Sequence, residues 1–291
     1  MTTNPDEGRK LKMLRNGDEP GRAADSHDKP LVSLITATLN SEKTLEETIR
    51  SVLRQTYDNI EHIIIDGGSA DSTLTILKKY SGQIAYWVSE PDKGISDAFN
   101  KGIAASTGEI IGIINADDWY NEDAVRHAVE QFRQSQADIV YGNLQLWDKD
   151  LKTELFFADH NQIEIEMTIN HPTVFVRRTA YEEIGLFRTD FRYALDYEWL
   201  LRAKHHGLRF HYINYVFTNM RLSGLSNRYW KQTEWETAKA RKLYAPGKSH
   251  YPFFLFQIAK GTARRFFERI HLHALVEFYH RHISRVKKIK A

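Results

Sequence analysis

The chain has 291 residues, of which 42% are hydrophobic and 27% are charged, and its formal net charge at pH 7 is +2. This composition is typical of a globular enzyme with one main domain, and the chain is long enough to bury a sizeable core. The absence of cysteine excludes disulfide bonds, thiol catalysis and cysteine metal sites. It fits a reducing cytosol, although a chain without cysteine is indifferent to redox state.

The first 29 residues are polar and balanced in charge, and they contain no apolar stretch of the kind found in a signal peptide. We therefore expect residues 1–29 to form a disordered polar leader. The folded domain is expected to begin at residue 30.

Three apolar runs, at residues 31–39, 60–65 and 110–114, are typical of strands buried on both faces of a parallel sheet. Amphipathic segments at residues 45–53 and 74–80 predict helices between the first strands. The pattern is βαβαβ, which predicts an α/β fold. It contains neither the G-x-G-x-x-G nor the Walker glycine pattern, so the glycines indicate neither a dinucleotide cofactor nor ATP.

Two adjacent carboxylates, Asp117 and Asp118, follow the third of these strands. Open α/β sheets bind ligands at the carboxyl ends of their strands. Neighbouring carboxylates repel one another unless a cation or hydroxyl donors share them, and hard oxygen ligands suit a divalent ion that also touches a diphosphate. The alternative is a helix N-cap, with Glu122 and Asp123 in the first turn of the helix.

These segments, taken together, resemble the family-two glycosyltransferases, which use nucleotide-diphosphate sugars. The matching stretches are Ser33-Leu34-Ile35-Thr36-Ala37-Thr38-Leu39-Asn40, Asp66-Gly67-Gly68-Ser69-Ala70-Asp71-Ser72-Thr73, residues 90–102, Asn115-Ala116-Asp117-Asp118 and Leu195-Asp196-Tyr197-Glu198-Trp199. They keep the family's order and spacing from about Pro30 to about Ser226. The resemblance implies a GT-A type, Rossmann-like fold, in which helices flank a mostly parallel sheet.

The resemblance implies that Thr36, Thr38 and Asn40 line the nucleotide pocket, where small polar side chains meet a ribose or a base edge. Asp66 is similar to the acid that reads the base, which accepts a hydrogen bond from the ring N–H of uracil or thymine. The alternative for Asp66 is a turn cap. Lys93 lies just before a predicted helix, whose N-terminus attracts anions such as a diphosphate.

At the metal site the sequence departs from the family's usual D-x-D, because Asn115 stands where the first Asp often is. We expect Asn115 to contact the sugar, and Asp117 and Asp118 to hold Mg²⁺ or Mn²⁺. Which of the two acids binds the metal directly is open. Asp117 is also expected to contact the donor nucleotide.

Asp196 matches the Asp of the family's Glu-Asp motif, although Leu195 replaces the Glu. The resemblance implies that Asp196 is the general base of an inverting transfer: it takes the proton of an acceptor hydroxyl as that oxygen attacks the donor sugar. The alternative is that Asp196 only caps a helix and that Glu198 is the base. Trp199 and Asp97 are further candidate contacts of the acceptor or the diphosphate.

His171 precedes a predicted strand at residues 174–176 and resembles a segment beside the acceptor pocket, although a lone His is more often structural. Arg221 resembles the start of a loop that often reads Arg-x-His and closes over the diphosphate. Ser223 replaces that His, so a phosphate or metal contact from position 223 is doubtful, while Arg221 remains a candidate for pairing with phosphate.

The C-terminal residues 248–291 contain ten Lys or Arg against two Glu, which gives a net charge of +8. Apolar residues fall on one helical face from Phe256 to Ile270 and again from Leu272 to Val286. We therefore expect residues 246–291 to form a basic amphipathic helical tail that binds an anionic membrane surface. The alternatives are packing on residues 30–245, the catalytic domain, or formation of a homodimer.

The sequence thus predicts an inverting glycosyltransferase that moves one sugar from a UDP- or dTDP-sugar to a saccharide or lipid-linked acceptor. We expect it in the cytoplasm, at the inner face of the membrane. No nucleic-acid partner is expected, because the acidic catalytic face would repel phosphates. The alternatives are a sugar nucleotidyltransferase, whose phosphate loop is absent, and a catalytically silent scaffold on the same fold.

Overall fold

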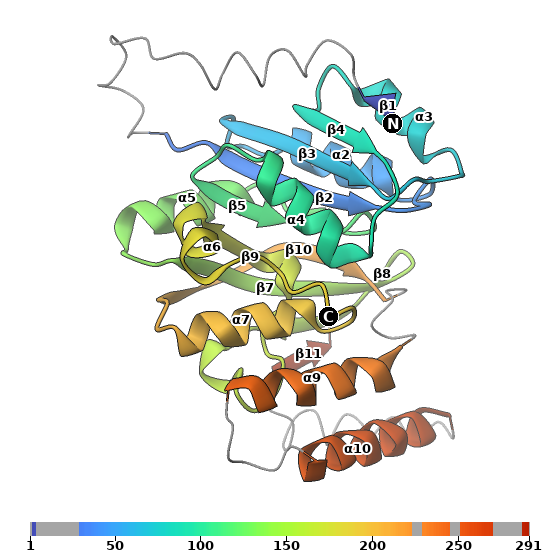
Figure 1. Ribbon diagram of the computed structural model, residues 1–291, viewed down its shortest axis with the longest axis vertical. Coiled ribbons are helices and arrows are strands. Elements are labelled where there is room, and N and C mark those ends of the chain that lie inside the picture. The colour runs from blue at the N-terminus through green and yellow to red at the C-terminus, as the bar shows by residue number, and fades with distance from the viewer. Residues whose placement is uncertain (1, 4–28, 223–228, 245–250, 270–286, 291) are drawn as a thin grey trace.

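The computed structural model describes residues 2–3, 29–222, 229–244, 251–269 and 287–290 of the chain. Its centre is an eleven-stranded sheet in which nine strands follow the order β1-β4-β3-β2-β5-β9-β7-β10-β6, while β8 pairs with β7 and β11 pairs with β8. Figure 1 shows the sheet with helices on its faces and, below them in this view, further helices stacked one after another. The expected mixed α/β architecture is confirmed.

The first half of the sheet is parallel and contains the three predicted strands, with β4 as an additional strand that was not predicted. It consists of β2 (Val32–Thr38), β3 (Ile60–Asp66), β4 (Tyr86–Ser89) and β5 (Ile110–Ile113). The connecting helices are α2 (Leu45–Leu53), α3 (Thr73–Tyr80) and α4 (Ile95–Ala105). Burial of these strands on both faces explains why their sequences are continuous apolar runs.

The second half of the sheet is mixed. Strand β9 (Val174–Arg177) runs antiparallel to both of its neighbours, β5 and β7 (Ile139–Asp148). Strand β10 (Phe210–Arg221) pairs parallel with β7 and antiparallel with the short β6 (Trp119–Tyr120). β8 (Leu151–Phe157) extends β7 as an antiparallel hairpin. This pairing brings the end of β10 to the segment that follows β5.

Helices cover this half and lead away from it. They are α5 (Ala124–Gln134), α6 (Arg178–Ile184), α7 (Leu195–His205), α9 (Trp230–Tyr244) and α10 (Tyr251–Arg269), with short 3₁₀ turns at His160–Gln162 and His171–Thr173. The largest buried cluster lies between the sheet and α4, α6 and α7, and includes Phe191, Tyr197 and Trp199. α9 packs on α7, and α10 packs on α9.

The terminal segments differ in part from expectation. Thr2–Thr3 form β1, which pairs antiparallel with β4, whereas residues 4–28 lie outside the described residues. The tail is helical in α10, but Lys287–Lys290 form strand β11 against β8, so the tail is not helical to its end. The second predicted apolar face, residues 272–286, is outside the described residues. Within the described ranges no helix is long and apolar enough to cross a membrane.

Candidate active site

Asp66 ends β3 and holds the turn that follows it. Its Oδ2 accepts hydrogen bonds from the backbone N–H of Gly68 at 3.2 Å and of Ser69 at 2.9 Å, and from Ser89 Oγ at 2.6 Å. Its Oδ1 accepts a hydrogen bond from Ser69 Oγ at 2.5 Å. The side chain is fully buried. The structure therefore shows the turn-capping role, and only Oδ1, with one bonded donor, retains capacity to accept from a nucleobase.

Thr36 and Thr38 at the end of β2 and Asn40 just after it, the predicted nucleotide contacts, occupy different environments. Thr36 is fully buried, and its hydroxyl lies 3.0 Å from His62 Nε2, inside the sheet. The buried hydroxyl of Thr38, directly opposite Asp66 in the register of β2 and β3, has no hydrogen-bond partner within the described part of the chain. Asn40 is exposed at φ 50°, and its side-chain oxygen accepts from Ala70 N–H at 2.9 Å. Thr38 and Asn40 thus lie at the carboxyl ends of the parallel strands, the edge that we call the rim and that also includes Asp66, Asp117 and Asp118, whereas Thr36 faces the interior.

Asp118 is buried and bonded within the chain. Its carboxylate accepts hydrogen bonds from Asn115 Nδ2 at 2.9 Å and from Arg221 N–H at 3.4 Å, and Thr48 Oγ1 donates to its carbonyl oxygen at 2.7 Å. Burial raises the pKa of Asp118 well above its usual value, and the adjacent charge of Asp117 adds to the rise. Asn115, predicted to contact the sugar, therefore uses its amide nitrogen to hold Asp118.

Asp117 is partly exposed, and among the described residues no side chain donates a hydrogen bond to its carboxylate. Burial raises its pKa. The N-cap alternative for the pair is wrong, because β6 follows at Trp119 and α5 begins only at Ala124, with Asp123 as its N-cap. Of the two acids, Asp117 is the one whose oxygens remain available at the rim.

Arg221, at the end of β10, joins this rim from the far side of the sheet. Its guanidinium donates to the carbonyl oxygen of Asp117, forms an ion pair with Glu47 of α2 and lies 4.6 Å from the centre of the Trp119 ring. The predicted Arg221 candidate therefore lies beside the two acids. Position 223, where Ser replaces the His of the resembled loop, is outside the described residues.

The segment before α4 lies against the Asp66 turn. A Cβ atom on Gly67 would lie 2.5 Å from Asp92 Oδ2, so only glycine fits there while Asp92 stays in place. Asp92 Oδ1 accepts from Gly94 N–H at 2.8 Å, and Asp97 Oδ2 accepts from Lys93 N–H at 3.0 Å. Asp92 and Asp97 therefore hold the turn that leads into α4, while the Lys93 side chain is exposed.

Asp196 lies in the first turn of α7, as predicted. Its side chain is partly exposed, and its Oδ1 accepts a hydrogen bond from Tyr197 N–H at 2.8 Å. Burial raises the pKa of Asp196 to about 6, and the negative charge of Glu236 on α9 adds to the rise. A carboxylate with a pKa in this range is suited to general-base catalysis near neutral pH.

Glu198 and Trp199 face the interior. Glu198 is fully buried; it accepts hydrogen bonds from Arg202 at 3.1 Å and from the hydroxyl of Tyr244. Trp199 is also fully buried, and its Nε1 donates to Gly185 O at 2.9 Å. In this structure neither side chain is available to a substrate. The geometry thus favours Asp196 over Glu198 as the base.

His171 is buried between two aromatic rings, with ring centroids 6.0 Å from Phe99 and 5.4 Å from Phe187. Burial lowers its pKa to about 4, so the ring is uncharged at neutral pH. Its Nε2 has no hydrogen-bond partner in the described ranges. The surroundings are those of a core residue, and its contact with an acceptor stays a prediction.

Sequence reasoning missed two contributors to the rim. Glu47 and Trp119 contact the guanidinium of Arg221. The ring centroid of Trp119 lies 5.4 Å from that of Trp147 in β7. Trp119 directly follows Asp118, which was a signal available in the sequence. Glu47 carried no such signal, because its partner lies 174 residues later in the chain.

The carboxylate oxygens at the end of β5 suit a divalent ion whose remaining ligands come from a substrate. No group of three or more Asp, Glu or His side chains able to hold a metal occurs in the described part of the chain. Mg²⁺ is commonly held by one or two carboxylates together with substrate phosphates, and the available carboxylate of Asp117, beside the bonded Asp118, matches that donor set. The residues therefore fit a metal bound jointly with a nucleotide diphosphate.

The chain belongs to glycosyl transferase family 2, whose model matches residues 33–185. The matched region contains the Asp66 turn, the start of α4 and the Asp117–Asp118 pair. An uncharacterized glycosyltransferase of Mycobacterium tuberculosis is 34% identical over 181 residues, which are 60% of this chain and 69% of that protein. A PGL/p-HBAD biosynthesis glycosyltransferase of Mycobacterium bovis is 28% identical over 179 residues, covering 60% and 70% of the two chains. The protein is therefore a glycosyltransferase.

Solved structures show the same fold at low sequence identity. Residues 1–349 of S. aureus TarS in complex with UDP align with a TM-score of 0.58 and 17% identity, over 74% of this chain and 65% of that one. The mannosyltransferase PcManGT of Pyrobaculum calidifontis, in complex with GDP-Man and Mn²⁺, aligns with a TM-score of 0.60 and 20% identity, over 88% and 76%. The chain thus spans just under two thirds of the TarS fragment. The fold is that of the GT-A glycosyltransferases.

Proposed function

We propose that the protein transfers a single sugar, with inversion, from a UDP- or dTDP-sugar to a hydroxyl of a saccharide or lipid-linked acceptor. The observation that carries the proposal is that the available carboxylates occur in two different surroundings, one as a pair of acids and one as a single acid. Asp117 and Asp118 lie together at the end of β5, whereas Asp196 begins α7 with its own hydrogen-bond environment. The first pair suits a metal and a diphosphate, and the isolated acid suits a base.

In this proposal the rim binds the donor. Thr38, whose hydroxyl has no partner among the described residues, and Asn40 contact the nucleoside, and Oδ1 of Asp66 accepts from the base. Asp117 holds Mg²⁺ or Mn²⁺, while Asp118 is held by Asn115 and Arg221 and orients its neighbour. When bound, the metal neutralises charge on the departing diphosphate. The mannosyltransferase neighbour, in complex with GDP-Man and Mn²⁺, supports the metal but not the choice of nucleotide.

Two cationic side chains, Lys93 and Arg221, are the candidates for contacting the diphosphate. Lys93 is exposed where α4 begins, and helix N-termini attract anions. Arg221 lies beside Asp117 but is already paired with Glu47, so its contact with phosphate requires that ion pair to be exchanged or shared. Lys93 is therefore the more available of the two in this structure.

Asp196 accepts the proton of the acceptor hydroxyl as that oxygen attacks C1 of the donor sugar, and the diphosphate departs in the same step. General-base assistance of this kind contributes roughly 10²- to 10⁴-fold to the rate. Support comes from the partial exposure of the carboxylate and from the raised pKa of Asp196, about 6. The Mycobacterium bovis relative, named for PGL/p-HBAD biosynthesis, supports a lipid-linked acceptor.

A thermal-shift panel of UDP-, dTDP- and GDP-sugars, each with Mn²⁺ or with EDTA, tests the donor proposal. The expected result is stabilisation by a UDP- or dTDP-sugar only when Mn²⁺ is present, and loss of that stabilisation in Asp117→Ala. A matched control is Glu122→Ala, which removes an exposed acid near the same segment. Equal stabilisation in EDTA, or by GDP-sugars alone, would contradict the proposal.

We also propose that α10 attaches the enzyme to an anionic membrane at its inner, cytoplasmic face. One side of α10 packs on α9: Phe254 contacts Trp235, and Gly261 lets the helix approach Trp230, where a Cβ would lie 2.7 Å from the ring. Another part of the surface of α10 is exposed and apolar. There Phe256 is 64% exposed and Phe266 is 57% exposed. Packing and membrane contact therefore use different faces of one helix.

Sedimentation with vesicles rich in anionic lipid tests this attachment on the full chain. We expect the protein to bind the vesicles, and high salt to weaken the binding, because charge is screened over about 8 Å at physiological ionic strength. The double substitution Phe256→Ser with Phe266→Ser should abolish binding. Leu151→Ser, at a residue 72% exposed in the β7–β8 hairpin, is the matched control. Absence of binding together with dimer formation would favour the alternative role of the tail.

A further inference from the structure

The turn that leads into α7 is held by a carboxylate from another helix. Glu236 of α9 accepts hydrogen bonds from three successive backbone N–H groups: Arg192 at 3.0 and 2.9 Å, Tyr193 at 2.7 Å and Ala194 at 2.9 Å. Ala194 is the N-cap residue of α7, which has no side-chain cap of its own. The first N–H groups of a helix lack partners within the helix, and Glu236 satisfies the groups that lead into α7.

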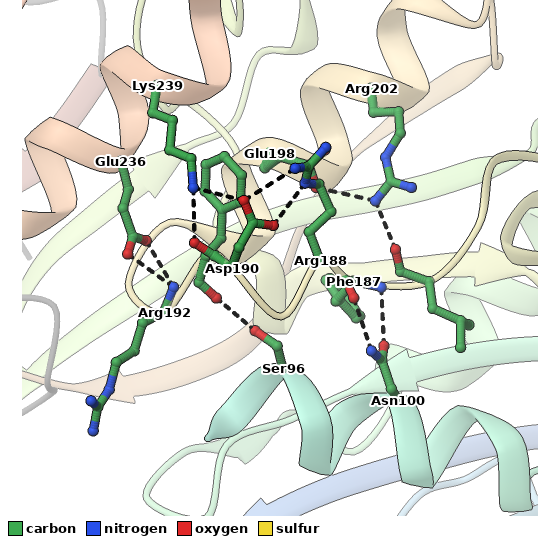
Figure 2. A network of polar contacts seen from close by, with 12 residues as sticks. Ser96, Asn100, Phe187, Arg188, Asp190, Arg192, Glu198, Arg202, Glu236 and Lys239 are labelled. Atoms are coloured by element: carbon green, nitrogen blue, oxygen red, sulfur yellow. Dashed lines mark hydrogen bonds and ion pairs between the residues drawn. The ribbon is translucent and has the colours of Figure 1, made fainter. Parts of the chain in front are cut away.

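The same loop is fixed from its other side by α4. Asn100 exchanges two hydrogen bonds with the backbone of Phe187, at 2.8 and 3.0 Å, and Ser96 Oγ donates to Phe191 O at 2.8 Å. Lys239, one turn from Glu236 on α9, bonds both the carbonyl and the carboxylate of Asp190. Figure 2 shows α9 and α4 reaching this loop from opposite sides. The loop therefore contacts α4, which begins beside the rim, and leads into α7, which carries Asp196.

Two features distinguish Glu236 from an ordinary helix cap. Its bonds to three N–H groups end at Ala194, two residues before Asp196, so they determine where the first turn of α7 begins. It also places a negative charge near a partly buried carboxylate. The other charged groups around this turn are already paired: Arg188 with Asp190, Asp190 with Lys239, and Glu198 with Arg202. Arg192 packs on Tyr193 and is exposed.

We propose that Glu236 is a positioning residue for the catalytic base: its carboxylate fixes the turn at residues 192–194 and thereby orients Asp196 toward the acceptor hydroxyl. The inference rests on the proposed function, since it assigns Glu236 a role only through Asp196. It gives α9, which lies outside the region matched by the family model, a part in the reaction. The charge of Glu236 is expected to help keep Asp196 basic, in agreement with the direction of its pKa.

Two variants separate charge from geometry. Glu236→Gln keeps an accepting oxygen but loses the charge, and its amide N–H₂ faces the N–H of Arg192. Glu236→Asp keeps the charge but is one methylene too short to reach all three N–H groups. Lys239→Met is the matched control, because it breaks a contact between α9 and the same loop without touching the N-terminus of α7.

The direct readout is the pH titration of Asp196 by carbon-13 NMR of carboxyl-labelled aspartate in the full chain without substrate, with the signal assigned through Asp196→Asn. Glu236→Gln should lower the pKa of Asp196 by about half a unit or more, because a nearby like charge raises a carboxyl pKa. Glu236→Asp should leave that pKa raised but lower kcat about tenfold at unchanged KM for the donor. Lys239→Met should change neither quantity beyond about twofold.

Unchanged pKa and kcat in both Glu236 variants, with only a lower unfolding midpoint, would overturn the inference and leave Glu236 as a structural cap. If Glu236→Gln does not fold, the kcat-to-KM comparison in Glu236→Asp still decides. Normal transfer by Asp196→Asn would instead refute the proposed base, and the NMR titration would still report whether Glu236 acts on that carboxylate. The two failures are therefore distinguishable.

Discussion

The donor rim and the start of α7 use acidic residues in opposite ways. At the rim, Asp66 and Asp118 are buried and their carboxylates are bonded to donors of the chain itself, whereas Asp117 stays available. Around α7 the neighbouring acids Asp190 and Glu198 are paired with cations, and Asp196 is the one left partly exposed. In each region a set of satisfied carboxylates surrounds one available carboxylate.

The bonded carboxylates of each region can hold its available carboxylate in place. A carboxylate that is fully bonded inside the protein is rigid, and a rigid neighbour can orient an acid that must bind a metal or a proton. The rim depends on bonds between strands, which pair along their whole length. The α7 turn depends on bonds from α4 and α9, so its geometry is set by helices from two different parts of the chain.

The largest effect should follow from metal removal. Excess chelator should abolish sugar transfer, and Mn²⁺ or Mg²⁺ should restore it, because the departing diphosphate then regains its cation. Asp117→Ala should weaken binding of the nucleotide diphosphate only in the presence of metal, as measured by calorimetry. Full transfer in excess chelator would break the distinction between a metal-binding rim and a metal-free base.

Glu198→Ala tests whether the buried acid of α7 is structural. It leaves Arg202, which is 13% exposed, without its carboxylate partner, and removal of one member of a buried ion pair costs about 3 kcal/mol. Urea unfolding should therefore show a loss near that size, whereas the exposed Glu183→Ala should stay within about 0.5 kcal/mol of the parent protein. A Glu198 variant with parental stability and no activity would show that the acid has a catalytic role.

Asp196→Asn should make the protein more stable, in contrast to Glu198→Ala. The pKa of Asp196 is raised from 3.8 to about 6, so the folded chain binds its proton more tightly than the unfolded chain does. Stability is therefore lost as pH rises from about 4 to about 6, and the penalty persists above that range. Removing the charge should add on the order of 1–3 kcal/mol at pH 7.5 and almost nothing at pH 4. Equal stability of both proteins at pH 7.5 would contradict the raised pKa.

The parallel half of the fold could be predicted from the sequence because strands buried on both faces are continuous apolar runs, which end visibly at Asp66 and Asn115. Of the strands in the mixed half, only β9 was predicted, as the apolar segment 174–176. Strand β10 has mostly half-buried residues and no simple alternation, and its place between β7 and β6 depends on pairing with segments about 70 to 100 residues away. Such pairing leaves little trace in a local pattern.

In the candidate site, too, local motifs could be recognised in the sequence, whereas contacts between distant segments could not. Asp117, Asp118 and Asp196 could be found because each lies in a motif beside a strand or a helix start. Adjacency in sequence could not tell which of the two acids is buried, since that depends on Arg221, 103 residues away. It also could not show that Glu198 is bonded to Tyr244, or that Glu236 holds the turn before Asp196. These contacts arise only from tertiary packing.

The most direct test compares turnover of Asp196→Asn with that of Glu198→Gln, using the nucleotide sugar that the thermal-shift panel selects, together with donor affinity for each variant. The account predicts that Asp196→Asn keeps donor affinity nearly intact while turnover falls about a hundredfold or more, and that a folded Glu198→Gln retains most of its turnover. Near-normal transfer by Asp196→Asn, with an inactive but folded Glu198→Gln, would contradict the account.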